Sequence, residues 1–242
     1  MNTLVKSVLV ITLFIFGVTD VSAQWGKKVV GNGNVTTRTV NTGSYDAVKG
    51  VGPMDIHLEK GSEGNISVSA EDNLHEYVIV EVKDNTLIVR IKKNTNLRTK
   101  KGIHVTVPFQ DISGVSLTGS GDIDTKDTIE SDNLKIGVTG SGDVDLNVIA
   151  SDLKVKVTGS GDIVLSGKTN DLEVRISGSG DFKGFDLDAQ NTDASVSGSG
   201  DARVVAKSSL KARVNGSGDI TYKGSPGQSD TKTSGSGDIS SY

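Results

Sequence analysis

The residues of this sequence best suited to chemistry are an aspartate and a serine that recur together seven times. The motif Gly-Ser-Gly-Asp begins at residue 119 and returns after 21, 19, 19, 20, 18 and 19 residues. Its aspartates are Asp122, Asp143, Asp162, Asp181, Asp201, Asp219 and Asp238, and its serines are Ser120, Ser141, Ser160, Ser179, Ser199, Ser217 and Ser236. Repeated carboxylates could bind calcium, act on glycosides or support turns. The choice depends on the elements that hold them.

Those elements are predicted to be β-strands. In LKVKVTGSGDIVL, Leu153, Val155 and Val157 alternate with polar residues, and Ile163 continues the alternation after the motif. Period-2 alternation is typical of a strand with one buried face. A fixed period near 19 residues is typical of a solenoid, in which each repeat buries its apolar face against its neighbours. The sequence therefore predicts an all-β fold, a parallel β-helix with coils of about 19 residues.

The two glycines of each motif are predicted to face inward at a narrow corner. Gly159 and Gly161 fall on the parity of the buried residues, where the absence of a side chain lets the backbone bend. Ser160 and Asp162 then point outward. Because stacked strands lie about 4.8 Å apart, like residues of successive coils form columns. We expect a column of aspartates beside a column of serines on the outer surface.

Three interpretations of the aspartate column remain open. It could be a structural ladder in which turn amides and hydroxyls donate to the carboxylates, a ribbon that faces a partner, or a calcium site. Exposed neighbouring carboxylates repel by only ~1 kcal/mol in water, which makes the column tolerable. One acidic corner per coil supplies fewer than the roughly six to eight oxygens that calcium prefers. The structural ladder is favoured, and no metal or cofactor is predicted.

The chain divides into three predicted regions. Residues 1–23 have the features of a secretory signal peptide: a lysine precedes an apolar run at 8–18, and small residues stand before the expected cleavage site. Residues 24–110 predict a less regular β region that packs on the solenoid, and residues 111–242 predict the GSGD-repeat β-helix. The apolar run is shorter than the ~20 residues that span a bilayer, so we expect no transmembrane span in the mature chain.

The N-terminal β region contains a hairpin, a degenerate repeat and a basic segment. The alternating stretch 77–93 is interrupted by an Asp-Asn pair, which predicts a hairpin. In KGVGPMDI, Gly50 and Gly52 keep the glycine spacing of the motif, which we interpret as a degenerate copy. The basic segment 92–102 is interpreted as a solvated turn. The alternative is a contact for an anionic glycan or a lipid headgroup.

The last coil is predicted to cap the solenoid. Positions that are apolar in earlier coils are occupied by Ser229, Thr231 and Thr233, so the inner face of this coil is polar. Such an end coil shields the core and the open strand edge. Two interruptions of the repeat, at 125–133 and 182–193, are predicted to be loops.

No catalytic residue and no metal site is predicted. The chain has no cysteine, and its three histidines, at positions 57, 75 and 104, lack zinc-ligand spacing. His57 and His104 are interpreted as exposed or hydrogen-bonded imidazoles in strands. Glycoside hydrolysis needs two carboxyls in unlike environments, whereas the seven motif aspartates are equivalent and no aromatic sugar platform accompanies them. The chain is therefore predicted not to be an enzyme; the alternative is an exported polysaccharide-active enzyme on a β-helix scaffold.

Charge and composition narrow the class of partner. The net charge of −4 offers no electrostatic footprint for nucleic acid. Glycine is abundant and aromatic residues make up 4% of the chain, but regular β-branched residues between the glycines argue against disorder. The absence of cysteine excludes a lipid-modified N-terminal cysteine, so we do not expect a lipoprotein.

The order of these features resembles a family of bacterial envelope proteins. The stretch GNGNVTTRTVNTGSYDAVKGVGPMDIHLEKG is followed by the hairpin and then by GSGD coils, as in the auto-transporter adhesin, head GIN domain family. The resemblance covers nearly all of the chain after residue 23. It implies an exported β-helical protein, typically from a Bacteroidetes-like bacterium, and it brings no catalytic residues.

These observations predict an exported, non-catalytic protein of the cell envelope. Its expected role is adhesion, or that of a structural or interaction module, and it presents a repetitive face. Its expected location is the periplasm, the cell surface or the medium. Candidate partners are a glycan, an envelope or matrix protein, or a second copy of the chain.

Overall fold

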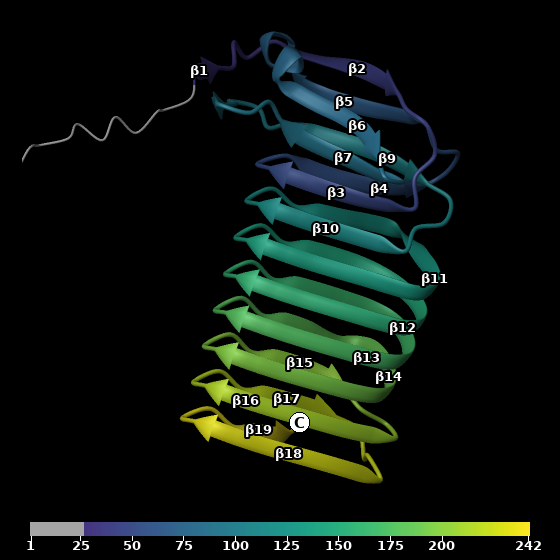
Figure 1. The fold of residues 1–242 in the computed structure, drawn as a ribbon, viewed down its shortest axis with the longest axis vertical. Coiled ribbons are helices and arrows are strands. Elements are labelled where there is room, and N and C mark those ends of the chain that lie inside the picture. Colours follow the sequence, from purple (N-terminus) through teal and green to yellow (C-terminus); the bar gives the residue numbers. More distant parts are fainter. Residues whose placement is uncertain (1–26) are drawn as a thin grey trace, which may run out of the picture.

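The computed structural model describes residues 27–242, and most of them lie in β-strands (Figure 1). The chain forms a parallel β-solenoid of about 7 turns of roughly 19 residues, so the predicted fold class is confirmed. The predicted signal peptide, residues 1–23, lies outside the described residues. In the described part of the chain, no helix has the length and apolar character that a membrane crossing requires.

The repeats form long strands that stack in parallel. They are β10 (Gly114–Gly119), β11 (Ile123–Gly140), β12 (Val144–Gly159), β13 (Ile163–Gly178), β14 (Phe182–Gly198), β15 (Ala202–Val205), β16 (Ser209–Gly216), β17 (Ile220–Lys223), β18 (Gln228–Gly235) and β19 (Ile239–Ser241). Successive coils pair in parallel and place motif glycine beside motif glycine, as with Gly140 and Gly159. The predicted stacking of identical positions therefore holds along the solenoid.

Each coil contributes to two sheets. The first part of β14 pairs with β15, whereas its last part, from Asn191 to Gly198, pairs with β16. We call the sheet built from the segments that lead into the GSGD motif the front sheet, since it faces the viewer in Figure 1. The segments that follow the motif form the rear sheet. The GSGD turns join the two sheets along one edge of the solenoid.

The core lies between these sheets as apolar columns. The front-sheet column that precedes the motif consists of Leu117, Val138, Val157, Ile176, Val196 and Val214, and all six are at most 2% exposed. The rear-sheet column that follows the motif consists of Ile123, Val144, Ile163, Phe182, Ala202 and Ile220, and all six are at most 1% exposed. Both columns were predicted to face inward, and burial confirms this for these coils. In the last coil, the residues predicted to face inward are not buried: Thr233 is exposed and Ile239 is half-buried.

The motif glycines are required because backbone stacks directly on backbone at the corner. Gly159 has a φ of +114°, and a Cβ there would lie 2.4 Å from the carbonyl oxygen of Gly140. A Cβ on Gly161 would lie 2.1 Å from the carbonyl oxygen of Gly142. The amides of Ser160 and Gly161 both donate to the Gly140 carbonyl, at 2.8 and 3.1 Å. No side chain fits between the turns.

The N-terminal region adds further strands to both sheets, and its first and eighth strands form a separate two-stranded sheet. Its elements are β1 (Lys27–Val30), β2 (Val35–Asn41), β3 (Ala47–Gly52), β4 (Asp55–Lys60), β5 (Asn65–Glu71), the 3₁₀ helix η1 (Asp72–Tyr77), β6 (Val78–Lys83), β7 (Thr86–Ile91), β8 (Thr95–Arg98) and β9 (His104–Phe109). Strands β6 and β7 form the predicted antiparallel hairpin. The turn residues Asp84 and Asn85 have φ values of 49° and 56°, which suit the twist of a tight hairpin.

Strands β3 and β4 form a first coil in the register of the repeats, but the predicted alignment of its glycines is wrong. Gly52 pairs with Gly119, whereas Gly50 pairs with Leu117. The register is set by burial, because it stacks Ile56 on Ile123 in the core. A Cβ on Gly50 would lie 2.8 Å from the side chain of Ile56, so Gly50 makes room inside the core and not at the corner.

Two further sequence features can be placed. Segments 125–133 and 182–193 were predicted to be loops, and this prediction is wrong. Both segments lie within strands, β11 and β14, where the pairing register shifts by a bulge. At the other end, every residue of β18 is exposed. Its residues Ser229, Thr231 and Thr233 pair with buried positions of β16, so this polar strand covers the last apolar row of the front sheet.

Candidate functional site

The motif aspartates form one continuous ladder along the corner edge. In each coil the Asp backbone N–H donates to Oδ1 of the aspartate one coil earlier, as in Asp162 N to Asp143 Oδ1 at 2.8 Å. The other links, from Asp143, Asp181, Asp201, Asp219 and Asp238, measure 2.8–2.9 Å. The ladder begins one coil earlier than the motif predicts, because the amide of Asp122 donates to Asp55 Oδ1 at 3.3 Å.

The second carboxylate oxygen differs between coils. Lys183 Nζ lies 2.6 Å from Asp162 Oδ2. Burial alone would raise the pKa of Asp162, but the hydrogen bonds from Lys183 and from the Asp181 amide outweigh it and lower that pKa below its ordinary value. In the part of the chain that the structure describes, no group of three acidic or histidine side chains has the geometry to hold a metal ion. The ladder can act by fixing turns in place, because each aspartate accepts the backbone amide of the next coil.

The motif serines lie beside the aspartates as predicted by parity. All seven, from Ser120 to Ser236, are exposed. Their backbone amides are occupied, since each donates to the carbonyl of the first motif glycine one coil earlier, as in Ser179 N to Gly159 O at 2.8 Å. These exposed serines follow the same edge as the aspartates. The edge thus presents a regular ribbon of hydroxyl groups.

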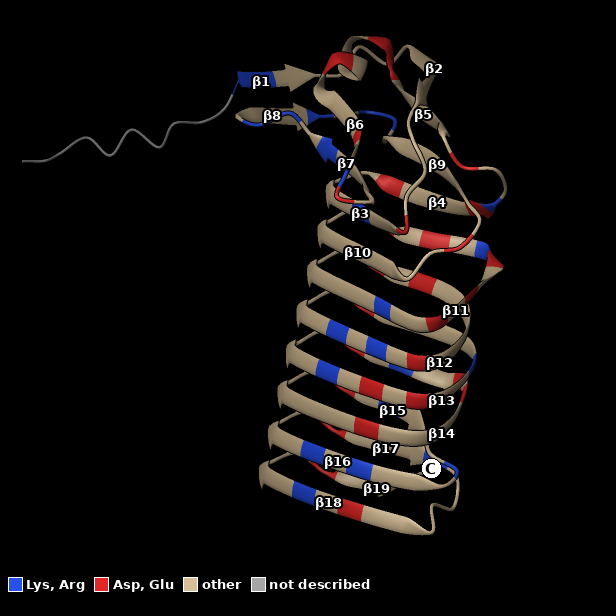
Figure 2. Cartoon of the chain, turned by 45° about the vertical axis from the view of Figure 1, so that its right-hand side comes forward, with Lys and Arg blue, Asp and Glu red and all other residues tan. Residues whose placement is uncertain are grey.

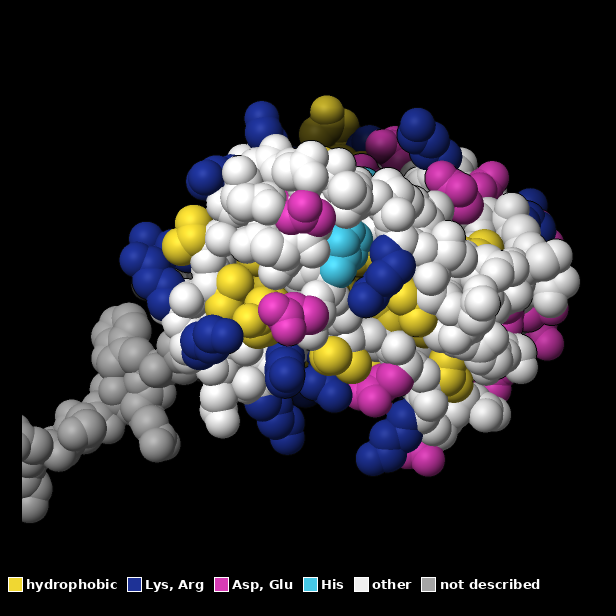
Figure 3. All heavy atoms as spheres, turned by 90° about the horizontal axis from the view of Figure 1, so that it is seen from above, with side chains coloured by type: hydrophobic (Ala, Val, Ile, Leu, Met, Phe, Trp, Pro, Cys, Tyr) yellow, Lys and Arg dark blue, Asp and Glu magenta, His cyan; other side chains and the backbone are white. Residues whose placement is uncertain are grey.

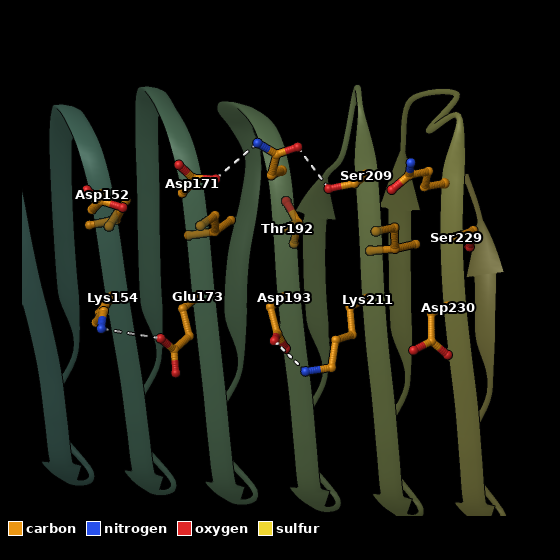
Figure 4. Close-up of a pocket in the computed structure, with 15 residues that line it drawn as sticks. Asp152, Lys154, Asp171, Glu173, Thr192, Asp193, Ser209, Lys211, Ser229 and Asp230 are labelled. Atoms are coloured by element: carbon orange, nitrogen blue, oxygen red, sulfur yellow. Dashed lines mark hydrogen bonds and ion pairs between the residues drawn. The ribbon is translucent and has the colours of Figure 1, made fainter.

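The second half of the front sheet carries charges that neutralise one another (Figure 4). Lys154 and Glu173 lie 3.7 Å apart, and Lys211 lies 2.9 Å from Asp193. Arg175 bridges Glu173 and Asp193, at 3.4 and 2.8 Å. Burial would raise the pKa of Asp193, but Arg175 and Lys211 lower it below its ordinary value. These columns line a shallow hollow of about 480 Å³, in which Lys154, Glu173, Asp193 and Lys211 are already paired with protein partners.

Two histidines meet on the rear sheet. His57 of β4 and His104 of β9 are stacked, with ring centroids 5.6 Å apart. His57 Nδ1 lies 2.8 Å from Asp124 Oδ2, and His104 Nδ1 lies 3.6 Å from Asp55 Oδ2. These partners confirm the interpretation of both imidazoles as exposed or hydrogen-bonded strand residues.

Basic side chains lie at several places around the N-terminal end of the solenoid, with acidic side chains among them (Figure 3). Strand β1 pairs with β8, which places Lys27 and Lys28 beside the basic segment 92–102. This segment is organised by a buried carboxylate: Glu71 accepts hydrogen bonds from the Thr99 hydroxyl at 2.6 Å and from the amides of Lys100 and Gly33. Burial would raise the pKa of Glu71, but these donors lower it below its ordinary value.

Sequence reasoning missed Glu71 and the charge columns of the front sheet. Glu71 ends an ordinary alternating strand, and no local signal shows that donors from two distant segments converge on it. The charge columns could have been anticipated in part, because Lys154 and Lys156 alternate with buried apolar residues and so face outward from the same strand. Their neighbours across strands follow only from the register of coils of unequal length.

Comparisons with known proteins fit this architecture. The model of a family described as putative auto-transporter adhesin, head GIN domain, matches residues 44–226. The crystal structure of a putative adhesin from Bacteroides fragilis is 28% identical with a TM-score of 0.85, and the match covers 88% of this chain and 100% of that chain. That of a putative lipid binding protein from Parabacteroides distasonis is 28% identical with a TM-score of 0.74, covering 89% and 100%. No curated protein matches the chain significantly.

Proposed function

The chain belongs to the family of the putative auto-transporter adhesin, head GIN domain, and we propose that it is an exported, non-catalytic adhesion module of the cell envelope. It acts through the outer surface of its solenoid, which presents repeated rows of side chains over a long, regular scaffold. The partner is a glycan, an envelope or matrix protein, or another copy of the chain. The 28% identical structure of a putative adhesin supports this assignment.

One observation carries the proposal. Among the described residues, the motif aspartates lie in one column, and each of their backbone amides donates to the aspartate one coil earlier in the same way. An active site instead needs a few unlike groups that converge on one point. In particular, glycoside hydrolysis needs one carboxyl with a raised pKa, whereas burial at Asp162 is outweighed by donors that lower its pKa. Columns of this kind suit repeated contacts with an extended partner.

An adhesion assay with an enzymatic arm tests the proposal. Beads coated with the purified full chain are incubated with surfaces carrying mucin, collagen or polysaccharide, and albumin-coated beads serve as the control. The expected result is specific retention on at least one surface. The soluble polysaccharides are assayed in parallel for new reducing ends or unsaturated products. Product release would favour the alternative of an exported polysaccharide-active enzyme, and retention equal to that of albumin would contradict adhesion.

A second candidate function is contact with anionic lipid headgroups through the basic end of the solenoid. The observation in its favour is the pairing of β1 with β8, which adds Lys27 and Lys28 to the basic segment 92–102. A 28% identical structure is described as a putative lipid binding protein. Flotation with vesicles containing phosphatidylglycerol tests this candidate. Binding that is lost when Lys92, Lys93, Lys100 and Lys101 are changed to Gln would support it, and equal binding to neutral vesicles would contradict it.

A further inference from the structure

The front sheet has a recess where neighbouring outward positions of two consecutive strands carry no long side chain. The first two outward positions of β10 are Gly114 and Ser116, and the outward position of β11 beside Ser116 is Gly137. Together with their neighbours they line a hollow of about 550 Å³. We call the hollow over these three residues the front-sheet recess. Its floor is formed by two glycines and a serine.

The fold does not require glycine at the centre of this floor. A Cβ on Gly137 would meet nothing closer than the Lys156 carbonyl oxygen, at 3.8 Å, which is an ordinary contact. Gly137 also lies outside the set of glycines with positive φ. At Gly114 the nearest atom would be the Cβ of Ala47, at 3.3 Å, and not backbone. Glycine inside a strand weakens the strand, and it often marks a place where a ligand approaches closely.

Cations surround the recess. In register with its floor lie Lys49 on β3, Lys135 on β11 and Lys156 on β12. Figure 2 shows the corresponding blue segments on β11 and β12 beside the uncharged β10. Within the described residues, no ion pair includes any of these three lysines. The hollow is also lined by Lys154, Arg175 and Glu173, and both of these cations are paired with Glu173. The recess therefore has unneutralised positive charge in a chain of net charge −4.

Hydroxyl groups line the edge of the recess nearest the GSGD corner. Thr118, Thr139 and Thr158 occupy the next outward position of β10, β11 and β12, and they pair in register. Thr118 and Thr139 are exposed. Lysine ammonium groups and hydroxyls at these spacings can bind a chain that carries both anionic groups and alcohols. The distance from β3 to β12 across the recess is three strand spacings, about 14 Å.

We propose that the front-sheet recess binds an acidic polysaccharide. Its carboxylate or sulfate groups pair with Lys49, Lys135 and Lys156, and a sugar ring lies flat on the floor at Gly137. The inference rests on the proposed adhesion function and names its ligand class. A lipid surface fits the recess less well, because the exposed large apolar residues, Val30, Val35, Ile149 and Tyr242, do not line it.

Filling the recess without changing its charge is the sharpest test. We expect Gly137→Tyr to fold normally, because the site has room for a Cβ and an ordinary φ. Binding of the full chain to heparin and to polygalacturonate is measured by titration calorimetry, with dextran as the neutral probe. The wild type is expected to bind an acidic probe and not dextran, and Gly137→Tyr is expected to bind at least tenfold more weakly. The matched control is Ser195→Tyr, on the same outward column but between two paired arginines.

A charge arm completes the experiment. Lys156→Gln is expected to weaken binding about tenfold, since hydrogen bonds to charged groups contribute that much. Lys211→Gln, where the lysine is paired with Asp193, is expected to change it little. If Gly137→Tyr and Ser195→Tyr reduce the affinity for the acidic probes equally, the recess is not the binding site. If dextran binds as tightly as the acidic probes, the ligand is not selected by its acidic groups, and the proposal is overturned. Binding of neither acidic probe would also overturn it, while retention of coated beads would leave adhesion standing. Binding to phosphatidylglycerol vesicles that is lost in Gly137→Tyr would replace the polysaccharide by a membrane.

Discussion

The GSGD corner and the front-sheet recess both depend on glycine, for opposite reasons. At the corner, Gly161 lies so close to the previous turn that a Cβ would come within 2.1 Å of a carbonyl oxygen. In the recess, Gly137 leaves space that a side chain could occupy, with 3.8 Å to the nearest atom. The corner glycines recur in every GSGD coil, whereas the recess glycines do not. A glycine that repeats from coil to coil is therefore required by the fold. A glycine that does not repeat, such as Gly137, instead gives one part of the surface its shape.

The largest expected loss of stability comes from placing a side chain at the GSGD corner. Gly159→Val combines a steric conflict with the Gly140 carbonyl and a φ of +114°, which a β-branched residue adopts only with strain. Together these are expected to cost about 3 kcal/mol or more in the free energy of unfolding. Denaturant titration measures it. Ser160→Val, on the exposed outward position, should be nearly neutral, and equal destabilisation by both changes would refute the inward assignment.

The next effect concerns a carboxylate that does not repeat. Glu71 is 0% exposed and accepts hydrogen bonds from the Thr99 hydroxyl and from the amides of Gly33 and Lys100. Glu71→Gln is expected to destabilise the fold by about 1–3 kcal/mol, since a buried amide cannot accept from all these donors. The measurement is the midpoint of denaturant unfolding. An unchanged midpoint would mean that the N-terminal end does not depend on this carboxylate.

The same residue predicts the direction of a pH effect. The pKa of Glu71 in the fold lies below its ordinary value of 4.5, so the unfolded chain binds a proton more readily than the folded one. The stabilisation by the carboxylate is complete above the ordinary pKa and is lost as the pH falls below it. The Glu71→Gln variant should therefore lose less stability on acidification than the wild type. Parallel curves for the two proteins from pH 6 to about pH 3 would contradict this.

A smaller effect is expected within the aspartate ladder. Asp162→Asn keeps an oxygen for the amide of Asp181 but removes the ion pair with Lys183. Because Lys183 is 42% exposed, solvent weakens the pair, and the loss is expected to be about 1 kcal/mol or less. Asp219→Asn is the matched control, since Asp219 accepts the next amide in the same way. If both substitutions cost the same, the ion pair contributes nothing measurable.

In the front-sheet recess, replacing glycine is expected to raise the stability of the protein and not to lower it. Gly137→Ala is expected to stabilise the protein by about 0.4–1 kcal/mol, because alanine restricts the unfolded chain and fits the native backbone. Thermal unfolding measures the shift. The corresponding change at the corner, Gly161→Ala, should be strongly destabilising because of the Gly142 carbonyl. A destabilising Gly137→Ala would show that glycine serves the fold at both places.

The smallest effect tests whether the ladder binds calcium. Every ladder aspartate except the last accepts the backbone amide of the next coil with one of its carboxylate oxygens. The described residues contain no cluster of side chains that could hold a metal ion. The midpoint of thermal unfolding should therefore be the same in excess chelator and in millimolar calcium. A large rise with calcium would show binding to the folded state, since a ligand that prefers this state stabilises it.

Much of the fold follows from local patterns. The alternation around Val157 predicts strands, the interval between motifs predicts the coil, and the Asp84-Asn85 pair predicts the hairpin turn. These signals are local because side-chain direction in a strand alternates with each residue and because glycine marks the tight corner. The outward direction of Ser160 and Asp162 follows from the same parity.

The sequence by itself determined the repeat, its strand character and the rows that face inward or outward. Only the tertiary structure decided which residues are neighbours across coils of unequal length. It shifted the first coil so that Gly52, not Gly50, meets Gly119, because burial of Ile56 sets the register. It also brought Lys49 and Lys156, which are far apart in the chain, to opposite sides of the floor at Gly137. The physical reason is that strand register is chosen by the sum of core contacts along each coil, which no single stretch of sequence contains.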